Sequence, residues 1–513
     1  MSAEPRDLSR LVASRWLRRL VEAAIYLIPA AVLLWLDHPA LGKTAWSDEW
    51  ATVQFSGLTW HDLRLATSHV DHFLLPYYAL VHVVRDLGGG LHEVRVLSLI
   101  SGVIAVVATQ LVARRIWGRI AALTAGLMLA VNPFFCLWVS QGRPPAVGYA
   151  AVAVSTLLVV FWWRVSPFVY PFVLTLGSLL FPPVALALVP HLYWRWRAAG
   201  WRSALRLMLQ GGAGIAVVVG WELLTRHQIA ALKVASEGGP SSFVGALNHA
   251  LGAKGWLPAL HAAALVAALV VLFGHRGPSH RQARRGLVLA VLLADGTAAL
   301  AWLATLGGVP MLADNLLVSA PIGSALLLAG LIGHRWFPLR SPDSEADVGL
   351  ALRGGFAAAS ALTLAFAGSW WISEAKAHIS ADGMELVAPL LVQRVQVGDV
   401  IVFQQPYATV GYTYSLAAAV GDDALRADLV KQLPYGAHPF VVRRVTGLDV
   451  ARTRLATVAT MPDGGADRVW VVRLPADPAN EVYRSVLECA DPQFQETPAL
   501  QTYLDLYVCE GAR

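Results

Sequence analysis

Residues 94–113 read VRVLSLISGVIAVVATQLVA, and Arg95 is the only charged residue in this stretch. About 20 apolar residues in a row match the length of a helix that crosses the hydrocarbon core of a bilayer. Similar stretches recur along the 513-residue chain, so the sequence predicts a membrane bundle. We expect further spans at 20–36, 120–138, 147–163, 207–224, 257–274, 286–306, 314–333 and 354–372.

The apolar stretch 167–194 is too long for one ordinary span. Pro182-Pro183 interrupts it, and proline lacks the N–H group that would continue a helix. We therefore expect two short helices here, which brings the total to about 11 transmembrane helices. The first span, 20–36, follows basic residues but has no clear cleavage site after it, so residues 1–19 are expected to form a cytoplasmic N-terminus before an uncleaved anchor.

The composition supports a membrane protein over a soluble one. Hydrophobic residues make up 56% of the chain, charged residues 14%, and the mean hydropathy is +0.54. Soluble domains carry about 25% charged residues. A net charge of +6 could indicate nucleic-acid binding, but the arginines lie between apolar runs, as in the loops of membrane proteins. The sequence therefore predicts the bilayer, and no nucleic acid, as a partner.

Arginine placement predicts the orientation. Arginines concentrate at 1–19, 114–119, 195–206, 276–285 and 335–353. Basic loops stay in the cytoplasm, so this pattern predicts a plasma-membrane protein with a cytoplasmic N-terminus and a first loop, 37–93, on the outer face. An odd number of spans places the C-terminus outside as well.

Residues 373–513 have the composition of a globular domain, predicted here as a small extracytoplasmic α/β domain. Strands are expected at 399–405, 440–445 and 468–474, and helices at 407–420 and 480–489. Cys489 and Cys509 could pair in an oxidising compartment. The alternative of two free thiols stays open.

The first loop carries an acidic pair, Asp48-Glu49, between Trp46 and Trp50. A carboxylate at the membrane surface can act as a general base on an acceptor hydroxyl. The alternative is a solvated turn whose tryptophans anchor it in the interface.

A second polar fragment runs from His69 to His82, and its apolar part is too short to span a membrane. We expect residues 76–82 to form a helix lying in the interface. Asp71, His72, Tyr77 and Tyr78 are its candidate substrate-binding residues. The spacing of His69, Asp71 and His72 fits no standard zinc signature, so no metal ligand is assigned, although these residue types leave a divalent metal open.

A third fragment, 132–145, follows the third expected span and contains Gln141 and Arg143. A guanidinium suits a phosphate group. An arginine whose stem snorkels at a membrane boundary is the alternative reading.

In this order, the three fragments resemble the GT-C superfamily, and in particular the actinobacterial mannosyltransferase-like branch of glycosyltransferase family 39. The likeness covers about residues 20–165. The matching segments are Asp48-Glu49, Asp71 with 76–82, Arg95-Val96-Leu97-Ser98, and Asn132-Pro133 with 141–146. The chain departs from the family where Gln141-Gly142-Arg143-Pro144 lacks an acidic residue, and where 313–315 reads Ala-Asp-Asn in place of an Arg-Tyr-like pair.

The resemblance implies an inverting transferase that moves a hexose or pentose, with mannose the family-level expectation, from a polyprenyl-phosphate donor to a glycan, lipoglycan or protein hydroxyl. It implies that Asp48, beside Glu49, is the catalytic base and that Arg143 faces the departing phosphate. Two other classes remain open: a transporter or flippase of a lipid-linked glycan, and a non-catalytic relative that acts as a binding partner. Few ionisable residues within the spans, mainly Glu222 and Asp295, speak against transport.

Overall fold

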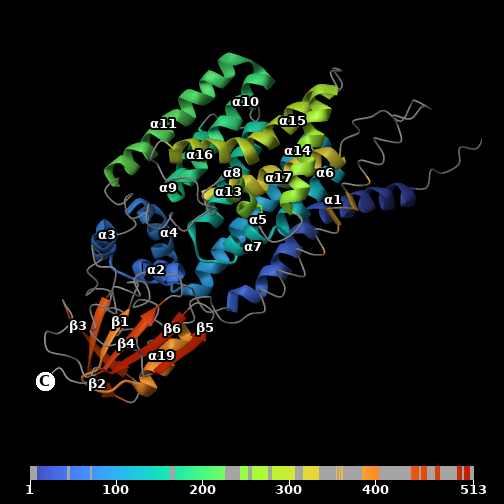
Figure 1. Ribbon diagram of the computed structural model, residues 1–513. Helices are drawn as coiled ribbons and strands as arrows, with labels where there is room; N and C mark the ends of the chain where they lie inside the picture. The colour runs from blue at the N-terminus through green and yellow to red at the C-terminus, as the bar shows by residue number, and fades with distance from the viewer. Residues whose placement is uncertain are drawn as a thin grey trace, which may run out of the picture. The chain divides into compact units, whose positions relative to one another are not determined.

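The computed structural model describes 8–42, 47–69, 72–161, 168–225, 243–251, 257–274, 280–306, 316–333 and 384–403, the strands from 441 to 508, and a few positions between 354 and 365. The chain divides into two compact units (Figure 1). The first unit comprises Met1–Leu41 with Arg95–Lys376, and the second comprises Gly42–Val94 with Ala377–Arg513.

The first unit is helical. Its elements are α1 (Leu8–Asp37), α5 (Leu91–Trp117), α6 (Arg119–Ala130), α7 (Pro133–Val139), α8 (Pro144–Val160), α9 (Val169–Leu180), η4 (Pro182–Ala187), α10 (Leu188–Ala199), α11 (Trp201–Thr225), α13 (Phe243–Ala250), α14 (Leu257–Gly274), α15 (Arg281–Val291), η7 (Leu292–Gly296), α16 (Thr297–Leu306) and α17 (Ser319–Gly333). The turn η1 (His38–Gly42) follows α1.

The protein is a multi-pass membrane protein. Within the described residues, four helices are long and apolar enough to cross a membrane, or up to five if a bent pair counts as one span. The four are Arg19–Gly42, Leu91–Trp117, Trp201–Trp221 and Arg281–Leu306. Shorter apolar helices occupy other expected positions, such as Pro144–Val160 and Ser319–Gly333. The expected span at 354–372 lies almost entirely outside the described residues.

Two apolar stretches divide into separate helices, one of them as expected. The 120–138 stretch forms α6 and α7, which meet at an angle of 66°. The Asn132 side chain accepts a hydrogen bond from Phe135 N at 2.8 Å, so it caps a new helix that Pro133 begins. The expected break at Pro182-Pro183 is confirmed, because α9 ends at Leu180 and η4 separates it from α10.

Polar contacts join α1 to its neighbours. Glu22 forms ion pairs with Arg114 and Arg119, at the ends of α5 and α6 that adjoin each other in sequence. Gln110 Nε2 donates to the Ile25 carbonyl at 2.5 Å. These contacts supply the hydrogen bonds that lipid cannot.

Small residues let α17 pack closely in the centre of the unit, where nearly all its residues are buried. A Cβ at Gly333 would lie 2.7 Å from Ala121 N in α6, and a Cβ at Gly330 would lie 2.8 Å from the Trp117 ring. Small residues at helix contacts are typical of membrane bundles, since they allow backbones to approach.

The second unit contains α2 (Ser47–Ser56), α3 (Trp60–His69), η2 (His72–Leu74), α4 (Leu75–Asp86), α19 (Met384–Arg394) and six strands, drawn orange to red in Figure 1. The strands are β1 (Val400–Phe403), β2 (Val441–Asp449), β3 (Arg452–Val458), β4 (Arg468–Arg473), β5 (Phe494–Ala499) and β6 (Thr502–Val508). Their order is β3-β2-β1-β4-β6-β5; β1 and β4 are parallel, and the other neighbours are antiparallel.

This sheet confirms the expected α/β region near the C-terminus. The expected strands at 399–405, 440–445 and 468–474 correspond to β1, β2 and β4. Each of the residues 400–403 is buried, as a central strand requires. The Asp399 carboxylate accepts hydrogen bonds from Trp470 Nε1 and Gln396 N, both at 2.8 Å, and so fixes the start of β1. The expected helices at 407–420 and 480–489 lie outside the described residues, as do Cys489 and Cys509.

Candidate functional site

The acidic pair of the first loop lies at the beginning of a helix. α2 starts at Ser47, so Asp48 and Glu49 occupy its first turn. The backbone N–H groups of a first helical turn have no partners within the helix, and the helix dipole is positive there. Acidic side chains are favoured at this end of a helix, and a carboxylate can act as a general base.

α2 is a packed helix and not a solvated turn. Glu49 is only 1% exposed, although glutamate is almost never fully buried unless it has partners. Val53, Phe55 and Ser56 are also buried, at 1% exposure or less. The helix that carries the acidic pair is therefore part of a packed core in the first loop.

His82 of α4 contacts the end of α2. Its Nδ1 donates to the Ser56 carbonyl at 2.8 Å, and its Nε2 lies 3.3 Å from Asp86 Oδ2. The Trp60 ring packs edge-on against the imidazole, with centroids 4.1 Å apart. His82 is 4% exposed, so its side chain is held within the contact between α2, α3 and α4.

The two candidate tyrosines are buried as well. Tyr77 and Tyr78 are both 0% exposed, on the first turn and a half of α4. Tyr78 packs on Phe55 of α2 with ring centroids 5.4 Å apart. This contact gives Tyr78 a packing role beside α2. His72 lies in η2 just before α4, and Asp71 lies outside the described residues.

A capped turn begins α3. Thr59 Oγ1 donates to Asp62 Oδ2 at 2.9 Å, and the Asp62 backbone N–H donates back to Thr59 Oγ1 at 3.2 Å. The bond from the Asp62 N–H to the Thr59 hydroxyl is an N-cap that fixes the helix start. Asp62 is thus an acid of the first loop with a structural role.

Arg95 closes the first loop within the first unit. It is 2% exposed, and its Nη1 donates to the carbonyls of Ala40 at 3.4 Å and Leu41 at 3.2 Å. These carbonyls follow α1, while Arg95 lies in the first turns of α5. Arg95 was matched to a family motif in the sequence. In the structure it joins the end of α1 to the start of α5, the two segments on either side of the first loop.

Gln141 and Arg143 lie in the turn between α7 and α8. Arg143 immediately precedes Pro144, which begins α8, and its extended backbone (φ −130°, ψ 155°) is the conformation expected before proline. Phe135 of α7 packs on Tyr149 of α8 at 4.8 Å between ring centroids, which fixes the turn. Within the described part of the chain, the buried Gln141 Oε1 has no hydrogen-bond partner.

The structure thus assigns the sequence candidates to two separate units. Asp48, Glu49, His72, Tyr77 and Tyr78 belong to the second unit. Gln141 and Arg143 belong to the first. Across the described residues, no group of three or more His, Cys, Asp or Glu side chains could hold a metal ion.

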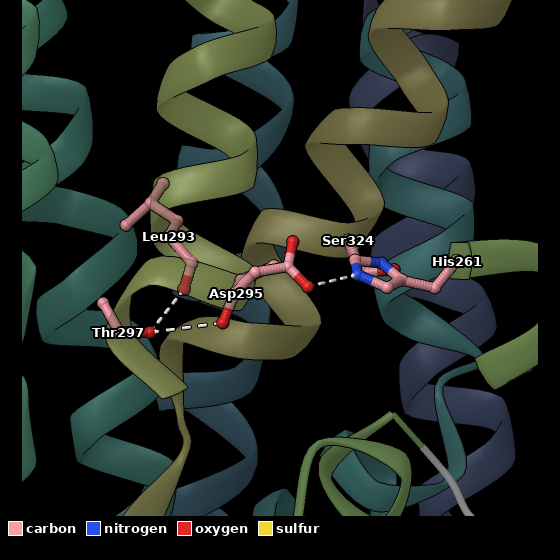
Figure 2. A network of polar contacts seen from close by, with 6 residues as sticks. His261, Leu293, Asp295, Thr297 and Ser324 are labelled. Atoms are coloured by element: carbon pink, nitrogen blue, oxygen red, sulfur yellow. Dashed lines mark hydrogen bonds and ion pairs between the residues drawn. The ribbon is translucent and has the colours of Figure 1, made fainter. Parts of the chain in front are cut away.

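Sequence reasoning missed one polar cluster in the first unit. His261 Nδ1 lies 2.9 Å from Ser324 Oγ, and His261 Nε2 lies 3.1 Å from Asp295 Oδ1 (Figure 2). Asp295 was noticed only as an isolated acid in a span. The one signal for it was that an ionisable residue within a span usually has a function and a partner.

Comparisons with known proteins give structural neighbours only. No family model matches the chain, and no curated protein matches it. The archaeal oligosaccharyltransferase AglB from Archaeoglobus fulgidus, in complex with an inhibitory peptide and a dolichol-phosphate, has 11% identity and a TM-score of 0.42 over 74% of this chain and 59% of that chain.

A second neighbour is ArnT from Cupriavidus metallidurans bound to undecaprenyl phosphate, with 12% identity and a TM-score of 0.44 over 94% of this chain and 98% of that chain. The same archaeal oligosaccharyltransferase, tethered to an acceptor peptide, gives 10% identity and a TM-score of 0.47 over 95% and 74%. This chain spans less than two thirds of the first neighbour's length.

Proposed function

We propose that the protein is a membrane glycosyltransferase of the GT-C type that transfers a sugar from a polyprenyl-phosphate donor to an acceptor hydroxyl on the outer face. The observation that carries this proposal is the burial of Glu49, at 1% exposure, on the first turn of α2. A solvated loop turn, which is the rival reading of the acidic pair, would leave both carboxylates in water. A buried acid beside Asp48 instead indicates a built site.

In this proposal Asp48 accepts the proton of the acceptor hydroxyl as that oxygen attacks the anomeric carbon. The bond between the anomeric carbon and the phosphate oxygen breaks, and polyprenyl phosphate leaves with the electron pair. Arg143 stabilises the departing phosphate through charge-assisted hydrogen bonds. The buried oxygen of Gln141, two residues before it, is suited to accept a hydrogen bond from a sugar hydroxyl.

The proposal assigns Asp48 to the acceptor hydroxyl and Arg143 to the phosphate of the donor. Asp71 and His72 are assigned to substrate positioning, and Tyr77 and Tyr78, both 0% exposed, support this segment from the interior. The N-terminus is then cytoplasmic, and the β-strand region lies outside. Reporter fusions at residues 280 and 400 test this orientation, since they should report opposite sides; the same side for both would contradict it.

The decisive experiment incubates the purified protein in lipid nanodiscs with a panel of polyprenyl-phosphate sugars and measures released polyprenyl phosphate. We expect release with one donor class, and loss of release in Asp48→Asn. Asp62→Asn is the matched control, because Asp62 is an acid of the same loop that bonds to Thr59 at the start of α3. No release with any donor would favour a flippase or a non-catalytic relative.

A further inference from the structure

Three helix ends bring arginines together on one side of the bundle. α10 ends at Ala199, α11 begins at Trp201, and α15 begins at Arg281. α10 packs against both α11 and α15 (Figure 1). The three ends carry seven arginines: Arg195, Arg197, Arg202, Arg206, Arg281, Arg284 and Arg285. Because neither 188–210 nor 281–291 contains an acidic residue, these ends form a strongly positive region.

Two of the seven arginines hold helices in place. Arg195 Nη2 donates to Ser203 Oγ at 2.5 Å and so joins α10 to α11. Arg284 Nη2 donates at 2.7 Å to the carbonyl of Leu272, in the last turn of α14. Carbonyls in a last helical turn have no partner within the helix, and a cation is favoured there. The packing of the helices therefore accounts for these two charges.

Three other arginines, which we call the arginine cluster, lie close together: Arg197 of α10, and Arg281 and Arg285 of α15. Arg197 and Arg281 both lie within electrostatic reach of Arg285, and their like charges repel. Tyr193 of α10 places its phenol group beside Arg197 and Arg285. Two helices thus direct three cations and a hydroxyl group to one place.

The arginine cluster has no described counter-charge. Among the residues that the structure describes, none of its members forms an ion pair, in contrast to Arg114 and Arg119, which both pair with Glu22. Arg285 Nε is buried and, over the described ranges, has no hydrogen-bond partner. Converging like charges and a buried donor without an acceptor both cost free energy. A bound anion would offset both costs.

The arginine cluster adjoins a surface that is suited to lipid. Trp196 and Trp201 flank the turn between α10 and α11, and both are exposed, as tryptophans at a lipid–water interface commonly are. The Arg197 guanidinium lies 5.6 Å from the centre of the Trp196 ring. Leu205 and Leu209 are exposed further along α11, which is one of the candidate spans. An apolar strip for acyl chains therefore lies next to the cations.

We propose that the arginine cluster and Tyr193 bind the headgroup of an anionic phospholipid, whose acyl chains lie along the exposed side of α11. Guanidinium groups bind phosphate oxygens through charge-assisted, bidentate hydrogen bonds, and the phenol adds a further donor. Three cations favour a headgroup with two phosphates, as in cardiolipin. Basic pockets between helices on the cytoplasmic side of membrane proteins bind such headgroups, and this end is cytoplasmic in the orientation proposed above.

Two simpler interpretations explain less of the geometry. Arginines that only set the orientation of the spans need to lie on the same side of the membrane, but they need not converge. A soluble phosphate would meet the same guanidinium groups, but it would leave the tryptophans and the apolar strip of α11 unused. The site is separate from the proposed sugar transfer, because none of its residues belongs to the candidate functional site.

The first test needs no variant. Full-length protein purified in detergent is titrated with cardiolipin, phosphatidylglycerol, phosphatidylcholine or inorganic phosphate, while thermal unfolding gives the Tm and native mass spectrometry counts bound lipids. A ligand that binds only the folded state stabilises it. We expect cardiolipin to raise the Tm by about 2 °C or more, phosphatidylglycerol to raise it less, and the other two to leave it unchanged.

The second test removes the charges. Arg197→Gln combined with Arg285→Gln should weaken cardiolipin binding by about 10-fold or more, since each arginine near an anionic surface contributes about 1 kcal/mol. Without anionic lipid this variant should match or exceed the wild-type Tm, because it relieves the repulsion. Arg202→Gln combined with Arg206→Gln is the matched control: it removes the same charge from α11 and should weaken binding by about 2-fold or less.

Three results would overturn the proposal. An equal rise in Tm with phosphatidylcholine would indicate a general effect of lipid. An equal loss of cardiolipin binding in the two double variants would indicate a diffuse effect of charge. A rise in Tm with inorganic phosphate as large as that with cardiolipin would assign the arginine cluster to a soluble anion.

Discussion

The protein places acidic residues in two different surroundings, and the contrast separates two roles. Asp48 and Glu49 lie on the first turn of α2, the end of a helix at which acidic side chains are favoured. Asp295 lies in η7, a widened π-helical turn between α15 and α16, and its one described partner is His261. Asp48 is proposed to act on an acceptor hydroxyl, whereas Asp295 forms a contact between helices of the bundle.

The largest expected effect distinguishes the two acids directly. Asp48→Asn should lower sugar transfer by about 10³-fold, because an amide cannot accept the proton of the acceptor hydroxyl. Asp295→Asn should leave the transfer rate at pH 6.5 close to that of wild type. Steady-state rates of polyprenyl phosphate release measure both. An equal loss of transfer rate in Asp48→Asn and Asp295→Asn would contradict a specific catalytic role for Asp48.

Arg143→Ala should have the next largest effect. Loss of a cation that stabilises the departing phosphate costs about 10²-fold in kcat/KM. Arg143→Lys should recover only part of this, because an ammonium group lacks the planar fork that binds two phosphate oxygens. Arg64→Ala, at an exposed arginine of α3, is the control. A normal kcat/KM in Arg143→Ala would assign the phosphate to another cation.

Gly323→Ala tests whether close packing builds the Asp295 cluster. The added methyl group would meet the Ala290 carbonyl oxygen at 2.7 Å, so we expect a loss of about 1–3 kcal/mol in stability. Gly212→Ala on α11 is the matched control, since a Cβ there meets nothing within 4 Å. Thermal unfolding of both variants measures the difference. Equal Tm values would show that α17 tolerates a wider separation.

The smallest expected effect concerns the support of α2. His82→Ala removes the hydrogen bond to the Ser56 carbonyl and should cost about 1 kcal/mol. His82→Gln keeps an N–H donor and should recover part of the loss. His61→Ala, whose side chain is 86% exposed, should be neutral. The rate of limited proteolysis in the first loop measures this loss of stability. Identical cleavage rates of His82→Ala and wild type would contradict the role of His82 in holding α2 against α4.

Local sequence patterns predicted the helices better than they predicted the bends and irregular turns within them. The hydropathy of 94–113 predicted α5, and the double proline at 182–183 predicted the break before α10. The bend between α6 and α7 was not predicted, although Asn132-Pro133 carries its signal as a cap followed by proline. The π turn at 292–296 has no comparable local signal, and it packs against α17.

In the candidate site, too, the sequence indicated residues, and only the structure showed how they pack. The sequence predicted a site at Asp48-Glu49, Tyr77 and Tyr78, with a solvated turn as the alternative interpretation of the acidic pair. The burial of Glu49 and the contact of Tyr78 with Phe55 emerge only when α2 and α4 pack together. His82 was read as the end of a motif, and its bond to Ser56 spans 26 positions of the chain.

By itself, then, the sequence determined the membrane character, the positions of most described helices and three of the strands, because apolar runs and breaking residues act over neighbouring positions. Only the tertiary structure decided that His261, Asp295 and Ser324 meet. His261 is 34 positions from Asp295 and 63 from Ser324, and no local pattern links them. Their meeting requires the glycine at 323, the widened turn at 292–296 and the packing of three helices at once.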